Sequence, residues 1–545
     1  MASLELAAGS LRVTYPDSYG VAPVRLGAAR RGGRAAGVSA WAEPTGPTDG
    51  VSAALLDAFA AQSMELVEPF ELVPATPAGP SVHRGLRPSH PGKVQIALDL
   101  PDGQDAVVLL EQDGFFSWQL PMGHRGTSTT SRRPGLSPAA AQSRGGPVSR
   151  VVRFEIDVRP VAPARPSAGW ARALGPFGDF VIGRVKAYVL RFASRFIPGA
   201  VMAFLERDTH PGLVLMTGND VKNWSLVNDL TQVTLPESRP ARILLFVHGT
   251  FSSTVGSYGV LTSTAQGQRL LAAAAGSYDA VIGFDHRTLS RDPLENAIDL
   301  HARLTALHLP FVPTIDIISY SRGALVARSL IEYLLPSSTW HVNIGKVVFV
   351  GATNAGTQLA EPDNWKDFVD LYTNLAVGAA RSIGFVTGTT PAAEIVRGLV
   401  AGIGAFVKYL VSASVTDRHI PGLAAMEPDG PFVTGINGTQ PNQPVAGTPW
   451  YVVSSDFEPK LFDDRHEPPE LPRELVSKLA DGLVDRLMGT KNDLVVDTGS
   501  MGAVDLPSGG GFIKDTLGFG TNSVVYHLNY FIQPRVCDAL GNWLI

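Results

Sequence analysis

Short apolar runs alternate with helical stretches along the chain from about residue 240 onward. Such alternation is typical of a parallel sheet that is covered by helices. We expect strands at residues 243–247, 280–284, 315–319, 346–350, 450–454 and 524–527. The pattern therefore predicts an α/β domain over residues 236–545.

Residues 357–447 interrupt this alternation with a long segment that is rich in Ala and Gly and largely helical, at 368–377 and 392–411. An insertion of this length is too long for an ordinary connection between two strands, so we expect a subdomain. Its functional interpretation is a helical cap or lid over an active site. The apolar stretch 398–411 would line an acyl pocket or touch lipid there, or else pack on the sheet as ordinary core.

Period-two alternation predicts a β-rich, sandwich-like domain at residues 1–165. Apolar residues alternate from Val94 to Leu100, Pro-Asp-Gly at 101–103 supplies turn chemistry, and residues 151–158 resume a strand-like pattern. Residues 122–147 contain almost no large apolar side chain, which predicts a flexible loop within this domain.

A helical connector is expected between the two domains, at residues 166–235. Apolar and aromatic residues recur at helical spacing over 180–205 and are interrupted at Pro198 and Gly199, which indicates two helices.

Composition excludes several classes of protein. The 45 Lys and Arg residues against 50 Asp and Glu give a net charge of −5, with no basic excess for nucleic-acid binding. The single cysteine, Cys537, cannot form an internal disulfide, and the N-terminus lacks a secretory pattern, so we expect a cytoplasmic protein. The most apolar stretch, 398–410, is broken by Lys408, and we expect no transmembrane segment.

The strongest chemical signal is Ser-Tyr-Ser-Arg-Gly at residues 319–323, which follows a predicted strand and opens a predicted helix. A small-x-Ser-x-Gly turn in this context is a nucleophile elbow, which lifts a serine hydroxyl out of the sheet. The motif alone also occurs by chance, and the strand-to-helix context is what favours Ser321 as a nucleophile. Ser319 stands where Gly is usual, and Gly323 supports the tight turn.

An oxyanion hole is predicted from Val-His-Gly-Thr-Phe at residues 247–251, where a buried strand ends. In α/β proteins that carry a nucleophile elbow, two backbone N–H groups bind the oxyanion: one from the loop after such a strand, and one from the residue after the nucleophile. The donors would be Thr250 and Arg322. Gly249 lets the backbone approach closely because it has no Cβ, and we expect His248 to shape the loop rather than act as a base.

The general base is predicted from chain order, which on this fold runs Ser, acid, His. Four histidines follow Ser321 in the sequence, and they are His341, His419, His466 and His527. Of these, His527 stands at the end of the last predicted strand and is the preferred base. Asp493 is the preferred acid and Asp456 the alternative, with Asp497 close by; each could instead be a solvated or helix-capping carboxylate.

The motifs at 247–251, 319–323, 492–496 and 526–528 together resemble α/β-hydrolases of the bacterial triacylglycerol lipase type. The resemblance covers about residues 236–545 and implies the triad Ser321, Asp493 and His527, with Thr250 as an oxyanion donor. In that family a strand ends in the His, and some similar lipases hold a structural calcium ion. This chain departs from the family at three positions without losing a catalytic atom: Tyr320 replaces a common His, and Ala324 and Leu494 each replace a common Gly.

The predicted function is that of a serine hydrolase that cleaves carboxylic esters, with acyl lipids as the favoured substrates. No zinc, calcium or phosphate-loop motif is evident in the sequence, so we expect no metal and no cofactor. The partners would be a small-molecule or lipid ester, a lipid surface touched by the cap, and an unknown protein bound by the N-terminal domain. Two alternatives are acyl transfer to an alcohol by the same triad, and a catalytically silent or effector-associated binding module on this fold.

Overall fold

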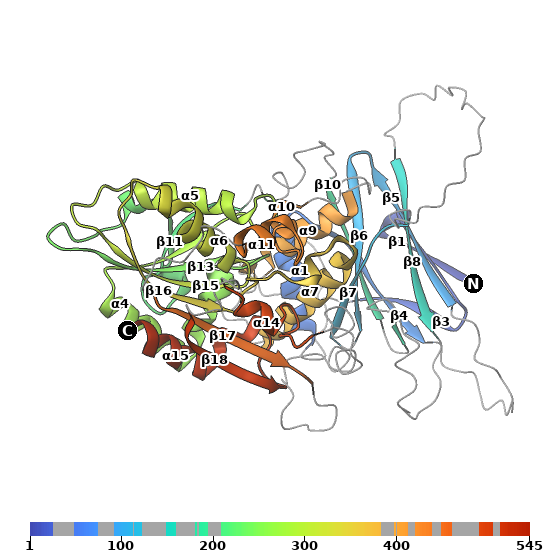
Figure 1. Cartoon of the computed structure of the whole chain (residues 1–545). Coiled ribbons are helices and arrows are strands. Elements are labelled where there is room, and N and C mark those ends of the chain that lie inside the picture. The colour runs from blue at the N-terminus through green and yellow to red at the C-terminus, as the bar shows by residue number, and fades with distance from the viewer. Residues whose placement is uncertain are drawn as a thin grey trace. The chain divides into compact units, whose positions relative to one another are not determined.

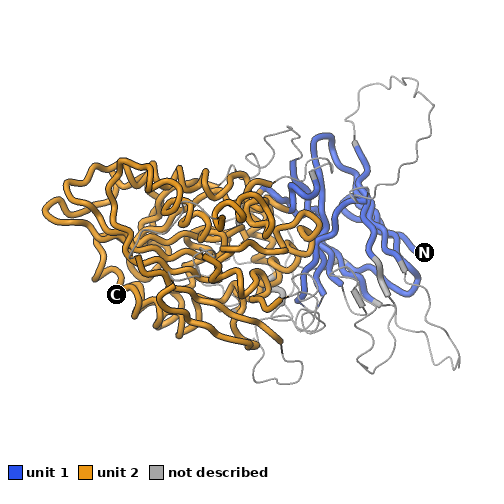
Figure 2. The backbone as a smooth tube through the Cα atoms, in the orientation of Figure 1, with its two compact units in different colours: residues 1–25, 63–201, 407–418 blue, residues 26–62, 202–406, 419–545 orange. Residues whose placement is uncertain are grey.

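A computed structural model shows two compact units (Figure 2). Unit 1 comprises Met1–Arg25, Ser63–Val201 and Val407–Arg418, and unit 2 comprises Leu26–Gln62, Met202–Phe406 and His419–Ile545. The structure describes residues 1–24, 48–74, 92–112, 114–122, 149–159, 180–181, 185–193, 206, 209–382, 397–398, 400–412, 420–438, 448–459, 490–504 and 513–545. Nearly all of the loop expected at 122–147 lies outside these residues.

Unit 1 contains two five-stranded sheets, with strand orders β1-β2-β5-β8-β9 and β3-β4-β10-β6-β7. The strands are β1 (Ala2–Leu6), β2 (Leu11–Tyr15), β3 (Tyr19–Pro23), β4 (Glu65–Pro74), β5 (Gly92–Pro101), β6 (Gln104–Gln112), β7 (Phe115–Gln119), β8 (Ser149–Arg159), β9 (Phe180–Val181) and β10 (Val185–Ala193). All their pairings are antiparallel except that of β8 with β9. Every second side chain of β5, from Val94 to Leu100, is buried, which fits its period-two pattern.

The prediction of a helix that begins near residue 180 is wrong, because residues 185–193 form strand β10. This strand lies between β4 and β6 and is buried along most of its length. A strand buried on both faces shows no period-two alternation, so its apolar run cannot be distinguished from helical spacing by periodicity alone.

One helix, α1 (Thr48–Ala61), lies within the range expected to be a β-rich domain and belongs to unit 2. Its buried residues Ser52, Leu55, Leu56 and Phe59 recur at helical spacing. The prediction of a β-rich domain over residues 1–165 missed this helix, although the helical spacing of these residues can be seen in the sequence.

Unit 2 is built on an eight-stranded sheet of order β12-β11-β14-β13-β15-β16-β17-β18 (Figure 1). The strands are β11 (Gly212–Leu215), β12 (Ser225–Val227), β13 (Arg242–Val247), β14 (Ala280–Asp285), β15 (Thr314–Tyr320), β16 (Asn343–Val350), β17 (Trp450–Phe457) and β18 (Ile513–Asn522). The six strands from β13 to β18 are parallel, while β11 pairs antiparallel with β14 and β12. The first five expected strands lie within β13 to β17.

The prediction of a strand at residues 524–527 is wrong. The last strand is β18, and His527 begins the 3-10 helix η12 (His527–Ile532). Most side chains of β18 are exposed at the edge of the sheet, so its sequence has no continuous apolar run. The sheet also begins earlier than residue 236, because β11 and β12 lie in the range expected to be a helical connector.

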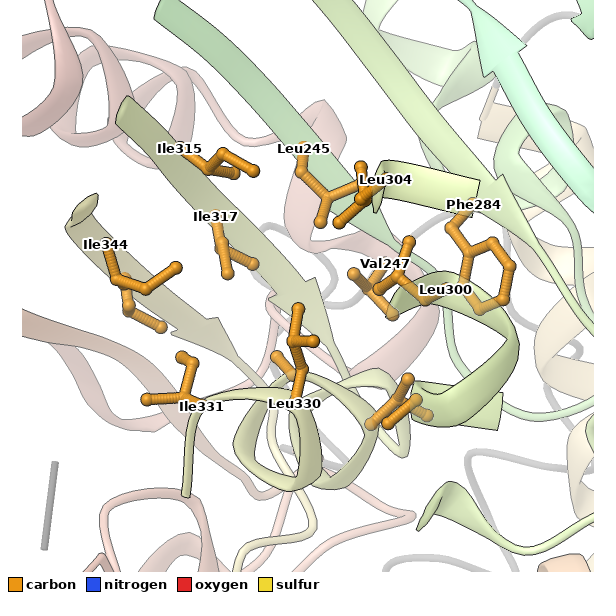
Figure 3. Close-up of a cluster of buried hydrophobic side chains, with 14 of the residues drawn as sticks. Leu245, Val247, Phe284, Leu300, Leu304, Ile315, Ile317, Leu330, Ile331 and Ile344 are labelled. Atoms are coloured by element: carbon orange, nitrogen blue, oxygen red, sulfur yellow. The ribbon is translucent and has the colours of Figure 1, made fainter. Parts of the chain in front are cut away.

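The apolar core of unit 2 lies between the sheet and the helices that flank it. Leu245 and Ile317 of the sheet face Leu300 of α5 (Pro293–Thr305) and Leu330 of η6 (Ser329–Leu334), and all four are fully buried (Figure 3). Burying a side chain of this size contributes about 1.5–3 kcal/mol. Because this core fixes β13 and β15, it also fixes the loops that follow them.

Residues 357–447 contain helices between β16 and β17. The described ones are η8 (Gln358–Ala360), η9 (Pro362–Asn364), α7 (Trp365–Ser382), α9 (Ala401–Ser412), α10 (Pro421–Ala424) and α11 (Pro431–Ile436). Within the described part of the chain, every helix is too short or too polar to span a bilayer.

Candidate active site

Ser321 occupies the sharp turn between β15 and α6 (Gly323–Arg328). Its φ of +54° lies in the left-handed region, which is strained for a residue with a Cβ. Its N–H donates to the carbonyl of Val350 at 3.0 Å. A Cβ on Gly323 would lie 2.2 Å from the carbonyl oxygen of Val247, so only glycine lets α6 begin this close to β13. The turn thus holds the serine at the carboxyl end of the sheet.

The structure brings Ser321, His527 and Asp493 into one hydrogen-bonded chain. Nε2 of His527 lies 3.0 Å from Oγ of Ser321, and Nδ1 of the same ring lies 2.8 Å from Oδ2 of Asp493. The three residues are 4%, 0% and 0% exposed. This is the geometry in which an imidazole takes a proton from a serine while a carboxylate fixes its tautomer.

The carboxylate of Asp493 is held by a tight loop after β17. Its Oδ1 accepts the N–H groups of Val495 at 3.1 Å and Val496 at 2.8 Å, and Oδ2 accepts the hydroxyl of Tyr530 at 2.9 Å. Leu494 has a φ of +79°, in the left-handed region that favours glycine. The side chain of Asn492 accepts its N–H at 2.9 Å and holds this strained turn.

The other two candidate acids make different contacts. Asp456, on β17, accepts the hydroxyl of Thr521 at 2.5 Å and lies 3.4 Å from Nζ of Lys491. Asp497 accepts the hydroxyl of Thr490 and stands at the N-cap position of the short helix α14 (Thr498–Met501), where its side chain makes no capping hydrogen bond. Burial and the charge of Asp493 raise the pKa of Asp497 to about 6.

The loop after β13 approaches the serine closely. A Cβ on Gly249 would lie 2.7 Å from Cβ of Ser321, so glycine is required here. Among the described residues, the N–H groups of Thr250 and Arg322 donate to no other group. The carbonyl of Thr250 accepts the hydroxyl of Tyr372, from α7, at 3.0 Å. Two backbone donors without a partner among the described residues therefore flank Ser321.

Among the described residues, the ring of His248 is hydrogen-bonded to the backbone of Gly249 and His286, and not to the serine hydroxyl. Its Nε2 accepts the N–H of His286 at 3.3 Å, which places the proton on Nδ1, and that atom lies 2.9 Å from the carbonyl of Gly249. The two imidazoles stack with ring centroids 4.1 Å apart. Burial lowers the pKa of both rings, so both are neutral at pH 7.

An aromatic cluster lies beside the candidate oxyanion loop. The ring of Phe251 packs against Phe368 and Tyr372 of α7 and Phe406 of α9, at centroid distances of 5.1 to 5.3 Å. Gly402 of α9 donates its N–H to the carbonyl of Phe251 at 3.0 Å. The inserted helices thus contact the loop that carries Thr250.

Three residues make contacts with Asp493 or His527 that were not predicted from the sequence. Gly351, with a φ of +51°, lies against Asp493 and His527: a Cβ there would be 3.2 Å from Oδ2 of Asp493 and 3.3 Å from Nδ1 of His527. Tyr320 donates its hydroxyl to the carbonyl of His527 at 2.7 Å, and Tyr530 contacts Asp493 as above. Gly351 at a strand end was a usable signal, whereas the two tyrosines contact partners far away in the sequence.

Within the described residues, no cluster of three His, Cys, Asp or Glu side chains could hold a metal ion. The arrangement allows a proton to pass from Ser321 to His527 while Asp493 orients the imidazole, next to two backbone N–H donors.

The parallel sheet, the elbow after β15 and the loops at its carboxyl end define an α/β-hydrolase fold. The chain belongs to the family described as "Domain of unknown function (DUF7379)", whose model matches residues 211–545. Residues 8–192 match a second model, "Domain of unknown function (DUF7362)". No curated protein matches the chain.

Several solved structures are similar to the chain at low identity. Lipase 1 from Pelosinus fermentans is 13% identical with a TM-score of 0.37, over 56% of this chain and 100% of that one. Lipase BlEst2 from Bacillus licheniformis, in its propeptide form, is 15% identical with a TM-score of 0.27, over 49% of this chain and 44% of that one. Phospholipase PlaB from Legionella pneumophila is 13% identical with a TM-score of 0.28, over 49% and 46%.

Proposed function

We propose that the protein is a serine hydrolase that cleaves carboxylic esters through an acyl-enzyme. The observation that carries this proposal is the chain from Ser321 through His527 to Asp493, with contacts of 3.0 and 2.8 Å. Ser321 attacks the acyl carbonyl, while His527 takes the serine proton and then passes it to the leaving alcohol. His527 next removes a proton from water, which attacks the acyl-enzyme and releases the acid. Asp493 orients the imidazole and stabilises its charged form.

The N–H groups of Thr250 and Arg322 hold the oxyanion in this proposal. Both belong to residues beside Ser321, one by sequence and one through the close approach of Gly249. Backbone donors fixed before the reaction stabilise the charge that develops on the carbonyl oxygen. Both donors are backbone groups, so the charge of the Arg322 side chain takes no part in holding the oxyanion.

Esters with an apolar acyl group are the favoured substrates. The cluster of Phe251, Phe368, Tyr372 and Phe406 supports this choice, because the buried side chains packed around the loop that carries Thr250 are aromatic. Hydrophobic contact contributes about 0.8 kcal/mol for each buried methylene. Lipid contact through the inserted helices, a cytoplasmic location and a partner for the N-terminal domain remain parts of the proposal.

Hydrolysis of a series of p-nitrophenyl esters, from acetate to palmitate, tests this function. We expect kcat/KM to rise with acyl length over the short members of the series. Ser321→Ala should lose at least about 10³-fold in kcat. A folded Ser321→Ala variant with wild-type turnover would contradict the proposal.

Acyl transfer to an alcohol is a second candidate. It is favoured by the 4% exposure of Ser321, since limiting water at the acyl-enzyme allows another acceptor to compete. Turnover with added glycerol or methanol distinguishes the two reactions: a transferase forms the new ester, and a hydrolase forms mainly the free acid.

A further inference from the structure

Glu206 binds three successive backbone N–H groups of the loop after β14. Its Oε1 accepts from Thr288 and from Leu289, each at 2.9 Å, and its Oε2 accepts from Ser290 at 2.7 Å. The glutamate is only 4% exposed, so these donors replace the water that a carboxylate would otherwise bind. One side chain therefore fixes residues 288–290, which are the first three of the segment 288–291.

This segment is bonded to the first candidate oxyanion donor. Oγ1 of Thr288 accepts the N–H of Phe251 at 3.2 Å. Phe251 has a φ of +60°, and its peptide follows Thr250 directly. The carbonyl of the same peptide accepts the hydroxyl of Tyr372 at 3.0 Å, so the peptide that joins Thr250 to Phe251 is held at both ends. This restricts rotation about the Cα–C bond of Thr250 and so limits the directions open to the Thr250 N–H.

The same segment is bonded to the second candidate donor. Nη2 of Arg322 donates to the carbonyl of Arg291 at 2.6 Å, and its Nε donates to the carbonyl of Gly422 at 3.2 Å. The N–H of Gly422 in turn donates to the carbonyl of Leu289 at 2.9 Å. Arg322 is fully buried, which lowers its pKa to about 10, and the negative charge of Glu206 opposes that effect.

We propose that Glu206 is a positioning residue that holds both backbone donors, those of Thr250 and Arg322, toward Ser321. The inference depends on the proposed function, since it assigns these N–H groups to an oxyanion. Glu206 does not touch the reacting atoms; it acts through its bonds to the segment 288–291 and through its charge, which favours the protonated guanidinium of Arg322. It also precedes residues 211–545, so a residue outside the family match supports the site.

Glu206→Gln tests the proposal because it keeps the size of the side chain and removes one accepting oxygen. The matched control is Glu332→Gln, since Glu332 is also 4% exposed and pairs with Arg328 at 2.6 Å. With a p-nitrophenyl ester as substrate, we expect Glu206→Gln to lower kcat about 10-fold or more and to keep KM within about two-fold of the wild-type value. We expect Glu332→Gln to change neither kcat nor KM. An alkyl trifluoromethyl ketone, which forms a tetrahedral adduct with an active serine, should bind Glu206→Gln more weakly by a similar factor.

Hydrogen exchange gives a readout that does not depend on catalysis. We expect faster exchange at residues 249–252 and 288–291 in Glu206→Gln than in the wild type, and no such change in Glu332→Gln. If the wild type hydrolyses no ester, the proposed function fails. The exchange result still decides whether Glu206 positions the loop, because it does not depend on hydrolysis.

Two outcomes overturn the proposal: wild-type kcat and exchange in a folded Glu206→Gln, or an equal loss of kcat in both variants. If Glu206→Gln does not fold, Thr288→Val carries the test, because it removes only the oxygen that accepts the Phe251 N–H. It should lower kcat about three-fold or more with KM within about two-fold, and unchanged kcat would overturn the proposal.

Discussion

The hydroxyl of Tyr530 donates a hydrogen bond to Oδ2 of Asp493 at 2.9 Å, the same oxygen that lies 2.8 Å from the imidazole of His527. Burial and the charge of Asp493 raise the pKa of this tyrosine well above its usual value, so the hydroxyl remains a donor at every pH of interest. Tyr530 therefore fixes the position of the carboxylate that contacts the imidazole of His527.

Tyr530→Phe should lower kcat/KM about 10-fold, because a hydrogen bond to a charged group contributes about 1.5–3 kcal/mol and part of that energy positions Asp493. Ester hydrolysis measures the effect. The control is Tyr451→Phe, whose ring stacks on Trp543. An unchanged rate in a folded Tyr530→Phe variant would remove the tyrosine from the account.

The choice between the two acids is tested by matched amide substitutions. Asp493→Asn should lower kcat by about 10³–10⁴-fold, because the amide cannot stabilise the imidazolium or fix its tautomer. Asp456→Asn should retain activity within about three-fold, since its carboxylate contacts Thr521 and Lys491. The reverse result would make Asp456 the acid.

Gly249→Ala should abolish turnover. The added Cβ would lie 2.7 Å from Cβ of Ser321, which forces the loop or the serine to move. Gly276→Ala, in helix α4 (Ala265–Ser277), is the matched control because its Cβ would meet nothing within 4 Å. That change should stabilise the protein by up to about 1 kcal/mol, as measured by denaturant unfolding. Equal activity of the two variants would contradict the close approach.

Stability should decrease as the pH falls below about 6.5, in part because of His248 and His286. Burial lowers the pKa of both residues in the folded state, so below pH 6.5 the unfolded chain binds protons that the folded chain does not. Each such histidine contributes a slope of up to about 1.4 kcal/mol per pH unit.

His286→Phe keeps a ring in the stack and should flatten this slope between pH 6.5 and 5, in urea unfolding at several pH values. His341→Gln, at an exposed position, should leave the slope unchanged. Parallel slopes for His286→Phe and the wild type would mean that His286 is not a neutral buried group.

The sequence predicted the parts of unit 2 whose signals are local. Strands β13 to β17 are short apolar runs, and the elbow at Ser321 combines a strand, a small-x-Ser-x-Gly turn and a helix within a few residues. His527 was selected by chain order, and the structure brings it to Ser321 even though the strand expected to precede it is absent.

The remaining features depend on contacts between distant parts of the chain. Strand β18 has an exposed edge pattern, and β10 is buried on both faces, so neither shows the periodicity of a half-buried strand. Glu206 binds groups 82 to 84 residues away, and Tyr530 binds an acid 37 residues away. No local pattern marks such partners.

Covalent labelling with a fluorescent fluorophosphonate tests the central claim most directly, because it requires an activated serine but not the natural substrate. We predict that the wild type is labelled, with detergent present to loosen the inserted helices, and that Ser321→Ala and His527→Ala are not. A folded wild type that stays unlabelled, or a Ser321→Ala variant that is labelled as strongly as the wild type, would contradict the assignment of Ser321 as the nucleophile. An unlabelled wild type would also favour a binding module on this fold.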